Sequence, residues 1–326
     1  MMKIAPVSLV IPTFNRAELI SETLNSAINQ SIKFQEIIVV DDGSSDNTGQ
    51  VLEKYKNVIK YIRTENQGVQ AARNTGISAS YSELVVLCDS DDLLESNYLE
   101  TTAPWMIKNI DCDVLYTNFS TFNEREMHPD KLAQSPFDFL RGAQINDHIA
   151  TQIPELYKRS IEYQPLFTCG MMIRKSFISR AGGYSTRFKG VGAEDWEFTL
   201  RAIDRGQIAL CIQPLAHVRK HAGNDSGNKI KMAIGEATIL EYALQNHTTA
   251  KNYETSIKKS IAKRRTDAFN EAFAQKDFSL AQEIAKKLPI RNFSVKHALK
   301  IMICNSPRSI RDAAWQFSQK DFNSKI

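Results

Sequence analysis

Residues 84–92 have the sequence LVVLCDSDD, an apolar run that ends in three carboxylates within four positions. Five consecutive apolar residues are typical of a strand that is covered by helices on both faces. Two earlier apolar runs, residues 7–11 and 37–40, have the same character, and apolar residues recur at helical spacing between Leu19 and Ile28. This alternation predicts βαβ units and a mostly parallel sheet.

The same alternation continues downstream and then changes. Residues 113–215 combine strands with helices in an α+β pattern, and beyond about residue 227 the spacing predicts four or five short helices. We expect an α/β domain over residues 1–228, made of a nucleotide-binding half (1–110) and an acceptor half (111–228), followed by a helical region (229–326). The individual elements expected are a helix that begins after residues 44–46, strands at 58–62, 114–117 and 208–212, and helices over 69–77, 175–181 and 195–204.

The composition is that of a globular protein, with 42% hydrophobic and 24% charged residues among 326. No apolar run approaches the roughly 20 residues that span a bilayer, and the first residues lack the pattern of a signal peptide, so we expect a cytoplasmic protein. The five cysteines are scattered without a C-x-x-C pair, which favours buried thiols over a disulfide framework or a zinc site.

Charge is distributed unevenly along the chain. Residues 1–230 carry 24 Lys and Arg against 28 Asp and Glu, whereas residues 231–326 carry 17 against 9. A basic helical region can contact an anionic membrane face or an acidic partner, and it can equally be a solvated surface.

Polar clusters follow three of the predicted strands: residues 12–16 (PTFNR), 41–44 (DDGS) and 89–92 (DSDD). Ligands of open α/β sheets bind outside the carboxyl ends of the strands, so these clusters predict a binding site at that edge. A divalent ion bound to a diphosphate takes oxygen ligands and few protein carboxylates. Asp91 is the first candidate ligand, Asp89 can reach metal-bound water or a ribose, and Asp92 can cap the next turn.

The other two clusters suit a nucleotide. Asp42 can accept a hydrogen bond from a base N–H beside the tight turn at Gly43, and Thr13 after Pro12 can offer a hydroxyl to the base or ribose. For each cluster the alternative is ordinary loop and helix-cap chemistry.

Residues 7–16, 39–46, 68–76 and 89–92 together resemble the motifs of glycosyltransferase family 2, over about residues 5–225. The resemblance implies a GT-A fold, which is a Rossmann-like mixed α/β sheet flanked by helices, here with a C-terminal helical appendage. It also implies inverting, metal-dependent transfer from a nucleotide sugar, expected to be a UDP-sugar, with Mn²⁺ or Mg²⁺. The residues implied for nucleotide-sugar binding are Pro12, Thr13, Asn15, Asp42, Arg73, Asp89, Ser90 and Asp91.

Residues 192–197 (GAEDWE) resemble the Glu-Asp motif of the family. The resemblance assigns Asp195 as the general base on the acceptor hydroxyl, and Glu194 can orient either the acceptor or Asp195. Acidic residues that simply stabilise a helix N-terminus are the alternative. Trp196 can stack on a sugar or lie in the core, and Gly170, within residues 168–174, can line the acceptor side.

Residues 219–226 (RKHAGNDS) are similar to a family segment in which a histidine completes the metal site. The spacing favours His221 over His217, so the resemblance implies a metal held by Asp91 and His221. A solvated or structural histidine is the alternative.

The resemblance implies transfer to a glycan or lipid-linked glycan in bacterial surface polysaccharide or lipopolysaccharide synthesis. A sugar nucleotidyltransferase usually has a Gly-rich loop after its first strand, and residues 12–16 contain no glycine. A non-catalytic nucleotide- or glycan-binding scaffold is the other alternative. For residues 229–326 we expect docking to the inner face of a membrane or self-association, and no nucleic-acid partner.

Overall fold

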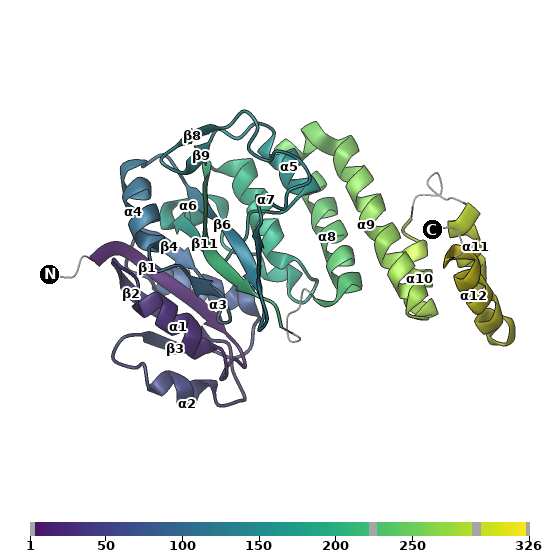
Figure 1. Cartoon of the computed structure of the whole chain (residues 1–326), viewed down its shortest axis with the longest axis horizontal. Helices are drawn as coiled ribbons and strands as arrows, with labels where there is room; N and C mark the ends of the chain where they lie inside the picture. The colour runs from purple at the N-terminus through teal and green to yellow at the C-terminus, as the bar shows by residue number, and fades with distance from the viewer. Residues whose placement is uncertain (1–3, 222–226, 289–294, 324–326) are drawn as a thin grey trace.

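The computed structural model describes residues 4–221, 227–288 and 295–323. Within these residues the strands form one 11-stranded mixed sheet, of which nine strands follow the order β3-β2-β1-β4-β10-β6-β11-β9-β8 (Figure 1). The strands are β1 (Ile4–Thr13), β2 (Lys33–Asp41), β3 (Lys60–Arg63), β4 (Leu84–Leu87), β5 (Leu93–Leu94), β6 (Val114–Phe122), β7 (Met127–Asp130), β8 (Gln144–Asn146), β9 (Ile149–Thr151), β10 (Met171–Arg174) and β11 (Ile208–Arg219).

The first four strands pair in parallel, as the apolar runs predict. The antiparallel strand β10 enters from later in the chain and separates β4 from β6, and β11 then runs parallel to β6. The expected mixed α/β architecture is therefore confirmed. β6 and β11 are longer than the runs 114–117 and 208–212 suggested.

Helices cover both faces of the sheet and build a separate core on each. Side chains of β1 that point to one face pack with α1 and α4, while Val10 on the other face packs with α3, α6 and α7. The helices of this domain are α1 (Ile20–Ile28), α2 (Thr48–Glu53), α3 (Val69–Ala79), α4 (Tyr98–Lys108), α5 (Leu156–Glu162), α6 (Lys175–Ala181) and α7 (Glu194–Arg205). All five cysteines are buried and free, as expected.

Gly76 sets how closely α3 approaches the sheet. A Cβ atom added at Gly76 would overlap Cγ1 of Val10, so we expect Gly76→Ala to destabilise the fold by about 1–3 kcal/mol. Gly49 in α2 is the matched control, because its added Cβ meets neighbours only at ordinary contact distances of 3.6 Å and more. Chemical denaturation should show a loss for Gly76→Ala and none for Gly49→Ala; equal losses would contradict the close packing.

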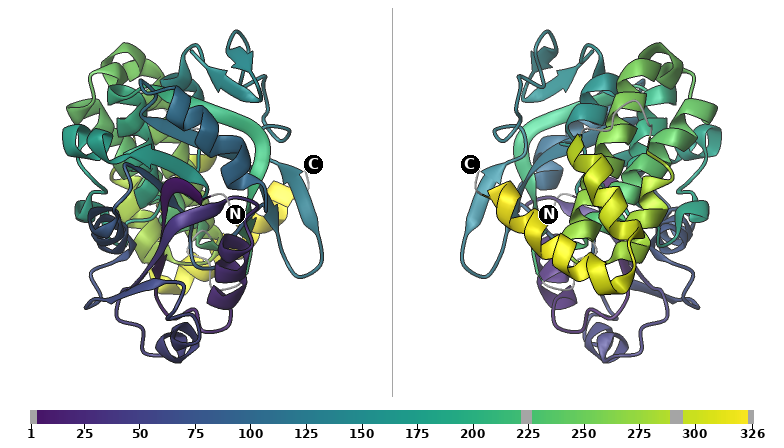
Figure 2. Two further views of the ribbon diagram at one scale, coloured as in Figure 1. Left: turned by 90° about the vertical axis from the view of Figure 1, so that its left-hand side faces the viewer. Right: turned by 90° about the vertical axis from the view of Figure 1, so that its right-hand side faces the viewer.

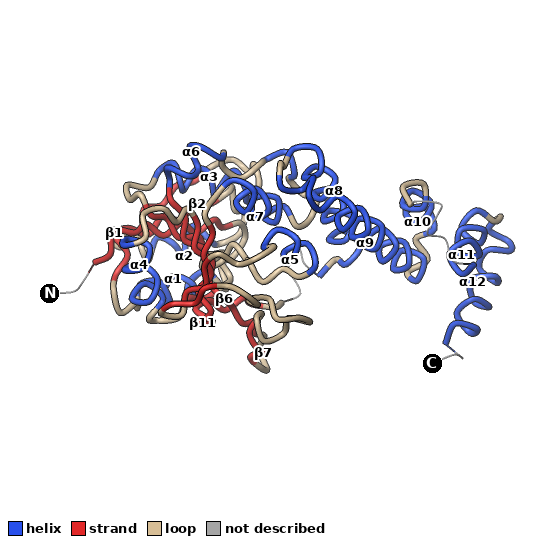
Figure 3. The backbone as a smooth tube through the Cα atoms, turned by 90° about the horizontal axis from the view of Figure 1, so that it is seen from above, coloured by secondary structure: helices blue, strands red, loops and turns tan. Residues whose placement is uncertain are grey.

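Two helices of the helical region are longer than the short helices expected from the sequence. α8 (Lys229–Asn246) and α9 (Glu254–Ala274) have 18 and 21 residues, because their apolar positions pack along two cores in succession. A 3₁₀ helix (Thr249–Tyr253) joins them, and α10 (Phe278–Ala285), α11 (Val295–Asn305) and α12 (Arg308–Asn323) follow. Seen from above, these helices extend away from the sheet to the far end of the molecule (Figure 3).

The two cores of the helical region have different partners. The first joins α7 to α8 and the start of α9, and it includes Trp196, Leu200 and Leu240. The second joins the start of α8 and the end of α9 to α10 and α11, and it includes Ile230, Phe269 and Phe273. The expected boundary at residue 228 therefore divides the sequence but not the core, since α8 and half of α9 pack on the α/β domain. Across the described residues, none of the helices combines the length and apolar character that crossing a bilayer requires.

Candidate active site

The loops that follow β1, β2 and β4 converge at the carboxyl edge of the parallel strands. Thr13 lies opposite Asp41 in register, and the backbone N–H of Asp42 donates to the carbonyl of Thr13 at 2.9 Å. Cys88, which leads into residues 89–92, donates its backbone N–H to Val10 at 3.1 Å. The three polar clusters predicted from the sequence thus share one edge of the sheet.

The loop after β1 presents one hydroxyl that lacks a protein partner. Thr13 is 3% exposed, and its Oγ1 has no hydrogen-bond partner among the described residues. A buried hydroxyl without a partner costs free energy, so a ligand that supplies the missing bond is a natural occupant. Pro12 beside it is buried and ends the strand, as expected.

Asn15 joins the loop after β1 to the loop after β2 by hydrogen bonds. It adopts a left-handed conformation (φ 52°), which asparagine tolerates, and its side-chain oxygen accepts from the N–H groups of Ser45 and Asp46 at 2.8 and 3.3 Å. The N–H of Asn15 donates to Ser44 Oγ at 2.9 Å. The side-chain oxygen of Asn15 thus holds the two loops together. The predicted nucleotide contact of Asn15 stays a prediction.

The Asp42 carboxylate organises the loop before α3. It accepts from the backbone N–H groups of Gln67 and Gly68 at 2.9 and 2.7 Å, and Gly68 has a positive φ of 97°. Each of its two oxygens therefore already accepts a backbone hydrogen bond. The predicted base contact of Asp42 stays a prediction, and it would use the remaining lone pairs.

The acidic cluster after β4 is held by cations on several sides. Asp89 accepts from Arg73 Nη2 at 2.7 Å, and Asp91 Oδ2 lies 3.2 Å from Arg16 Nε and 3.0 Å from His221 Nε2. Ser90 between them is 5% exposed.

Asp92 is turned inward from this cluster. Its Oδ1 accepts from the N–H of Arg219 at 2.9 Å, which ties the acidic turn to the end of β11 rather than capping a helix. Burial, together with the negative charges of Asp89 and Asp91, raises the pKa of Asp92.

Asp91 and His221 can contribute to a metal site. A carboxylate oxygen and an imidazole nitrogen 3.0 Å apart are donors that Mn²⁺ accepts, and the other ligands of such an ion come from substrate phosphates and water. Among the described residues, no three His, Cys, Asp or Glu side chains form a cage for a metal by themselves. The pair therefore fits an ion that is bound together with a diphosphate.

The choice of His221 over His217 as a metal ligand stays a prediction. His217 pairs with Glu95 and packs edge-on against Phe122, so its ring is engaged elsewhere. Residues 222–226, the rest of the predicted segment, lie outside the described residues.

Asp195 approaches the same edge from the acceptor half. It lies in the first turn of α7, which begins after Ala193 in a left-handed conformation (φ 56°). Burial raises the pKa of Asp195, and the negative charges of Asp89 and Glu194 add to the rise, while the positive charge of Arg73 opposes it. The neighbouring Glu194 accepts from the N–H of Gly190 at 2.9 Å, which closes the turn before the helix.

A family model described as "Glycosyl transferase family 2" matches residues 8–177, more than half of the chain. The chain belongs to glycosyl transferase family 2. A second model, described as the N-terminal domain of galactosyltransferase, matches residues 148–217.

Curated relatives match parts of this family 2 chain. "Glycosyltransferase GlyA" of Streptococcus pneumoniae is 35% identical over 123 residues, which are 37% of this chain and 18% of GlyA. "Poly(ribitol-phosphate) beta-N-acetylglucosaminyltransferase TarP" of Staphylococcus aureus is 39% identical over 100 residues, 29% of this chain and 31% of TarP. The chain thus spans less than a third of the length of these two relatives.

A solved structure shares the fold over nearly the whole chain. Residues 1–349 of S. aureus TarS in complex with UDP-GlcNAc superpose with a TM-score of 0.61 at 19% identity, covering 99% of this chain and 92% of that one. At this identity the match shows the fold, and it extends through the helical region as well as the GT-A domain.

Two residues expected on the acceptor side of this family 2 chain lie inside the protein. Trp196 is 3% exposed and lies in the core between α7 and α8, with Arg264 of α9 over its ring, so it is not available to stack on a sugar. Gly170 is also buried: an added Cβ would lie 2.6 Å from Thr117 Oγ1, and its carbonyl accepts from Tyr98 OH at 3.0 Å. The backbone of Gly170 thus approaches other parts of the protein closely, and its predicted place on the acceptor side stays a prediction.

Arg16 and Gln70 were missed as site residues. Arg16 contacts the candidate metal ligand Asp91, and Gln70, one turn before Arg73, is 2% exposed with its Nε2 lacking a partner among the described residues. Both lie within the quoted motifs. The signal that could have found Arg16 was its position as the last residue of the polar cluster 12–16, whereas nothing local marks Gln70 as buried.

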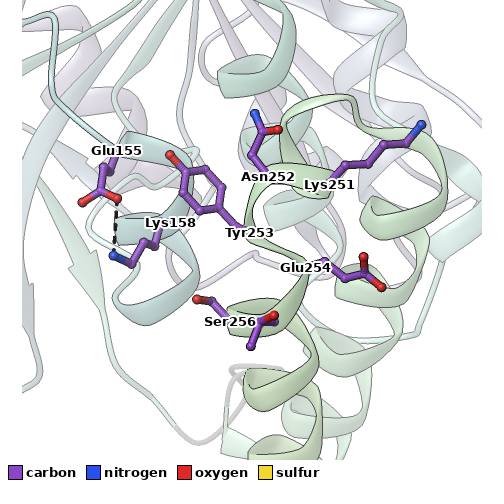
Figure 4. Close-up of a pocket in the computed structure, with 8 residues that line it drawn as sticks. Glu155, Lys158, Lys251, Asn252, Tyr253, Glu254 and Ser256 are labelled. Carbon is purple, nitrogen blue, oxygen red and sulfur yellow. Dashed lines mark hydrogen bonds and ion pairs between the residues drawn. The ribbon is translucent and has the colours of Figure 1, made fainter.

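A surface hollow of about 340 Å³ lies away from these residues, between α5 and the start of α9 (Figure 4). It is lined by polar side chains of which Glu155 and Lys158 pair with each other at 3.3 Å. Because none of the candidate residues lines it, we assign it no part in the site.

Proposed function

We propose that this chain is an inverting glycosyltransferase that moves a sugar from a nucleotide sugar, most simply a UDP-sugar, to a hydroxyl of a glycan or lipid-linked glycan. The proposal rests on carboxylates from both halves of the domain that lie at one edge of the sheet: Asp89 and Asp91 from the first half and Asp195 from the second. Arg73 interacts electrostatically with both Asp89 and Asp195. The orphaned hydroxyl of Thr13 at the same edge supports a ligand there.

Each of these residues has its own role in the proposed displacement at the anomeric carbon. Asp195, as a carboxylate, takes the proton of the acceptor hydroxyl while that oxygen attacks the anomeric carbon from the face opposite the leaving diphosphate, which inverts the anomer. Asp91 and His221 would hold Mn²⁺ or Mg²⁺, which supplies positive charge to the diphosphate when bound. Thr13 and the loop shaped by Asn15 and Asp42 hold the nucleotide.

The named relatives support this setting. TarP is named for transfer of N-acetylglucosamine to poly(ribitol phosphate), and another relative, GgaA of Bacillus subtilis, is named a minor teichoic acid biosynthesis protein. TarS has been solved with UDP and with UDP-GlcNAc. We propose a bacterial surface polysaccharide as the acceptor class for this chain too, with synthesis in the cytoplasm at the inner membrane face.

The deciding experiment measures release of UDP from a panel of UDP-sugars, with and without Mn²⁺, in the presence of a bacterial polysaccharide extract. Metal-dependent release from one donor supports the transferase and names its sugar. Binding of UDP with Mn²⁺ but no turnover of any donor would favour the scaffold alternative, and production of a nucleotide sugar from a sugar phosphate and UTP would favour a nucleotidyltransferase.

The transfer rate should fall as the pH is lowered. This fall should begin at a higher pH than the titration of an ordinary aspartate would produce. Asp195 must be ionised to act as a base, and burial raises its pKa above the usual value near 4. The acidic limb of kcat/KM against pH should therefore lie above that value, and Asp195→Glu should move it. An acidic limb that does not respond to Asp195→Glu would mean that another group titrates.

For the helical region we propose docking to an anionic membrane surface through α11 and α12. Large apolar side chains are exposed along one stripe of each helix, at 295, 299 and 302 and at 310 and 317, with exposed fractions of 87% for Val295 and 69% for Phe317. Between residues 295 and 318, four Lys and Arg stand against one Asp. Both helices lie at the end of the molecule farthest from the sheet (Figure 1), and they are nearest to the viewer when the molecule is seen from that end (Figure 2, right).

Basic charge beside an apolar stripe suits anionic lipid better than a second copy of the same positive surface. We expect the protein to float with vesicles that contain phosphatidylglycerol at low salt, to float poorly with neutral vesicles, and to lose flotation in the Met302→Asp, Phe317→Asp double variant. Ile145→Asp, which changes an exposed apolar residue of the distant β8, is the control. A concentration-dependent dimer that the double variant abolishes, with no flotation, would assign the stripe to a second copy instead.

A further inference from the structure

Arg73 is more deeply enclosed than a residue that simply contacts a nucleotide. Its side chain is 5% exposed, and its guanidinium donates to Asp89 Oδ1 at 2.7 Å. Its centre lies 5.2 Å from the centroid of the Tyr184 ring, in cation–π geometry. The Nε atom has no partner among the described residues.

Tyr184 continues this contact to the helix that carries Asp195. Its backbone is fixed to α3 by Asn74, whose side chain both donates to the Tyr184 carbonyl and accepts from the Tyr184 N–H, each at 2.8 Å. Its ring stacks on Phe198 of α7 with centroids 4.3 Å apart. Arg73 therefore contacts Asp89 directly on the donor side, and it reaches α7 on the acceptor side through the Tyr184 ring.

The charges agree with these contacts. Arg73 is the neighbour that favours the ionised form of Asp195, against burial and against the charges of Asp89 and Glu194. The same two aspartates, Asp89 and Asp195, raise the pKa of Arg73. One buried cation thus interacts with a carboxylate from each half of the site.

We propose that Arg73 is a positioning residue that joins the two halves of the site, holding the donor-side Asp89 and the acceptor-side Asp195 in their working arrangement rather than binding the nucleotide. The inference rests on the proposed transferase function and adds to it a single residue on which both halves depend. It replaces the nucleotide contact expected for Arg73 from the family resemblance.

The first test compares UDP affinity with turnover. We expect Arg73→Met to bind UDP nearly as tightly as the wild type in calorimetry, while kcat falls about 100-fold, the size of loss that a misplaced reacting group causes. Arg73→Lys, which keeps the charge and is the safer variant for folding, should recover part of kcat. Loss of UDP affinity as large as the loss of kcat would overturn the inference, whereas a wild type that neither binds UDP nor turns over would refute the proposed function itself.

The second test needs no activity. If Arg73 balances Asp195, the unfolding midpoints of Arg73→Met, Asp195→Asn and the double variant should be non-additive, because removing the Asp195 charge relieves part of the damage caused by losing the cation. Asp113, which pairs with Arg180 instead, is the matched control, and Asp113→Asn should add independently to Arg73→Met. Additive effects for Asp195 would separate the two residues and overturn the inference even if the enzyme is an active transferase.

Discussion

Asp195→Asn should lower kcat by about 10²–10⁴-fold, the range that a positioned general base contributes. The substitution keeps the size of the side chain and the start of α7, but an amide cannot take the proton of an acceptor hydroxyl. It also removes a half-buried negative charge, which Arg73 only partly compensates, so the folded state should be retained. Measuring single-turnover transfer together with UDP affinity separates the chemical step from donor binding.

Glu194→Gln is the matched control for this prediction. Glu194 lies next in sequence and accepts a backbone hydrogen bond from Gly190, which a glutamine oxygen can also accept. We expect a far smaller loss of kcat than for Asp195→Asn. Asp195 would not be the base if Glu194→Gln lowered kcat as much as Asp195→Asn does, or more.

Asp91→Ala should abolish metal-dependent transfer, with a loss of at least about 10²–10³-fold, as expected when one group that stabilises developing charge is removed. Asp91 is the carboxylate that His221 and Arg16 both approach, so its loss removes a ligand and leaves two cationic or polar groups without their partner. Titration of the rate with Mn²⁺ should show no saturation in the variant. Mn²⁺ should also cease to strengthen UDP binding.

Asp46→Asn is the control at the same edge of the sheet. Asp46 is exposed and accepts from the N–H of Thr48 at the start of α2, and this bonding lowers its pKa. Its loss should cost at most about 1 kcal/mol of stability and leave the response to Mn²⁺ intact. Unchanged Mn²⁺ dependence in Asp91→Ala would exclude Asp91 as a ligand and point to a metal-independent reaction.

The sequence predicted the fold of residues 1–110 well because its signals there are local. Each buried strand is a short apolar run with a polar cluster at its end, and parallel strands bring such clusters together without further information. The proximity of Asp91 to His221 was also anticipated, although 130 residues separate them, because the resemblance linked two motifs that no local pattern connects.

The acceptor half was predicted less well because its arrangement depends on distant packing. β10 inserts between β4 and β6, and no pattern within residues 171–174 specifies those neighbours. Trp196 looks the same in sequence whether it faces a sugar or a core, and only α8 and α9 decide between the two. The lengths of α8 and α9 likewise follow from two successive cores rather than from helix propensity.

The two cores of the helical region decide which part of this protein can be replaced by the corresponding part of a relative. α8 and the first half of α9 share a core with α7, so any chimera that replaces them would disturb the helix that carries Asp195. The change of core within α9 lies between Ile261 and Ala268, but α8 spans both cores, because Ile230 at its start belongs to the second. A graft that replaces α10–α12 would therefore have to keep the apolar surface that packs with Ile230, and only the outward-facing side chains of α11 and α12 can be exchanged without disturbing α8.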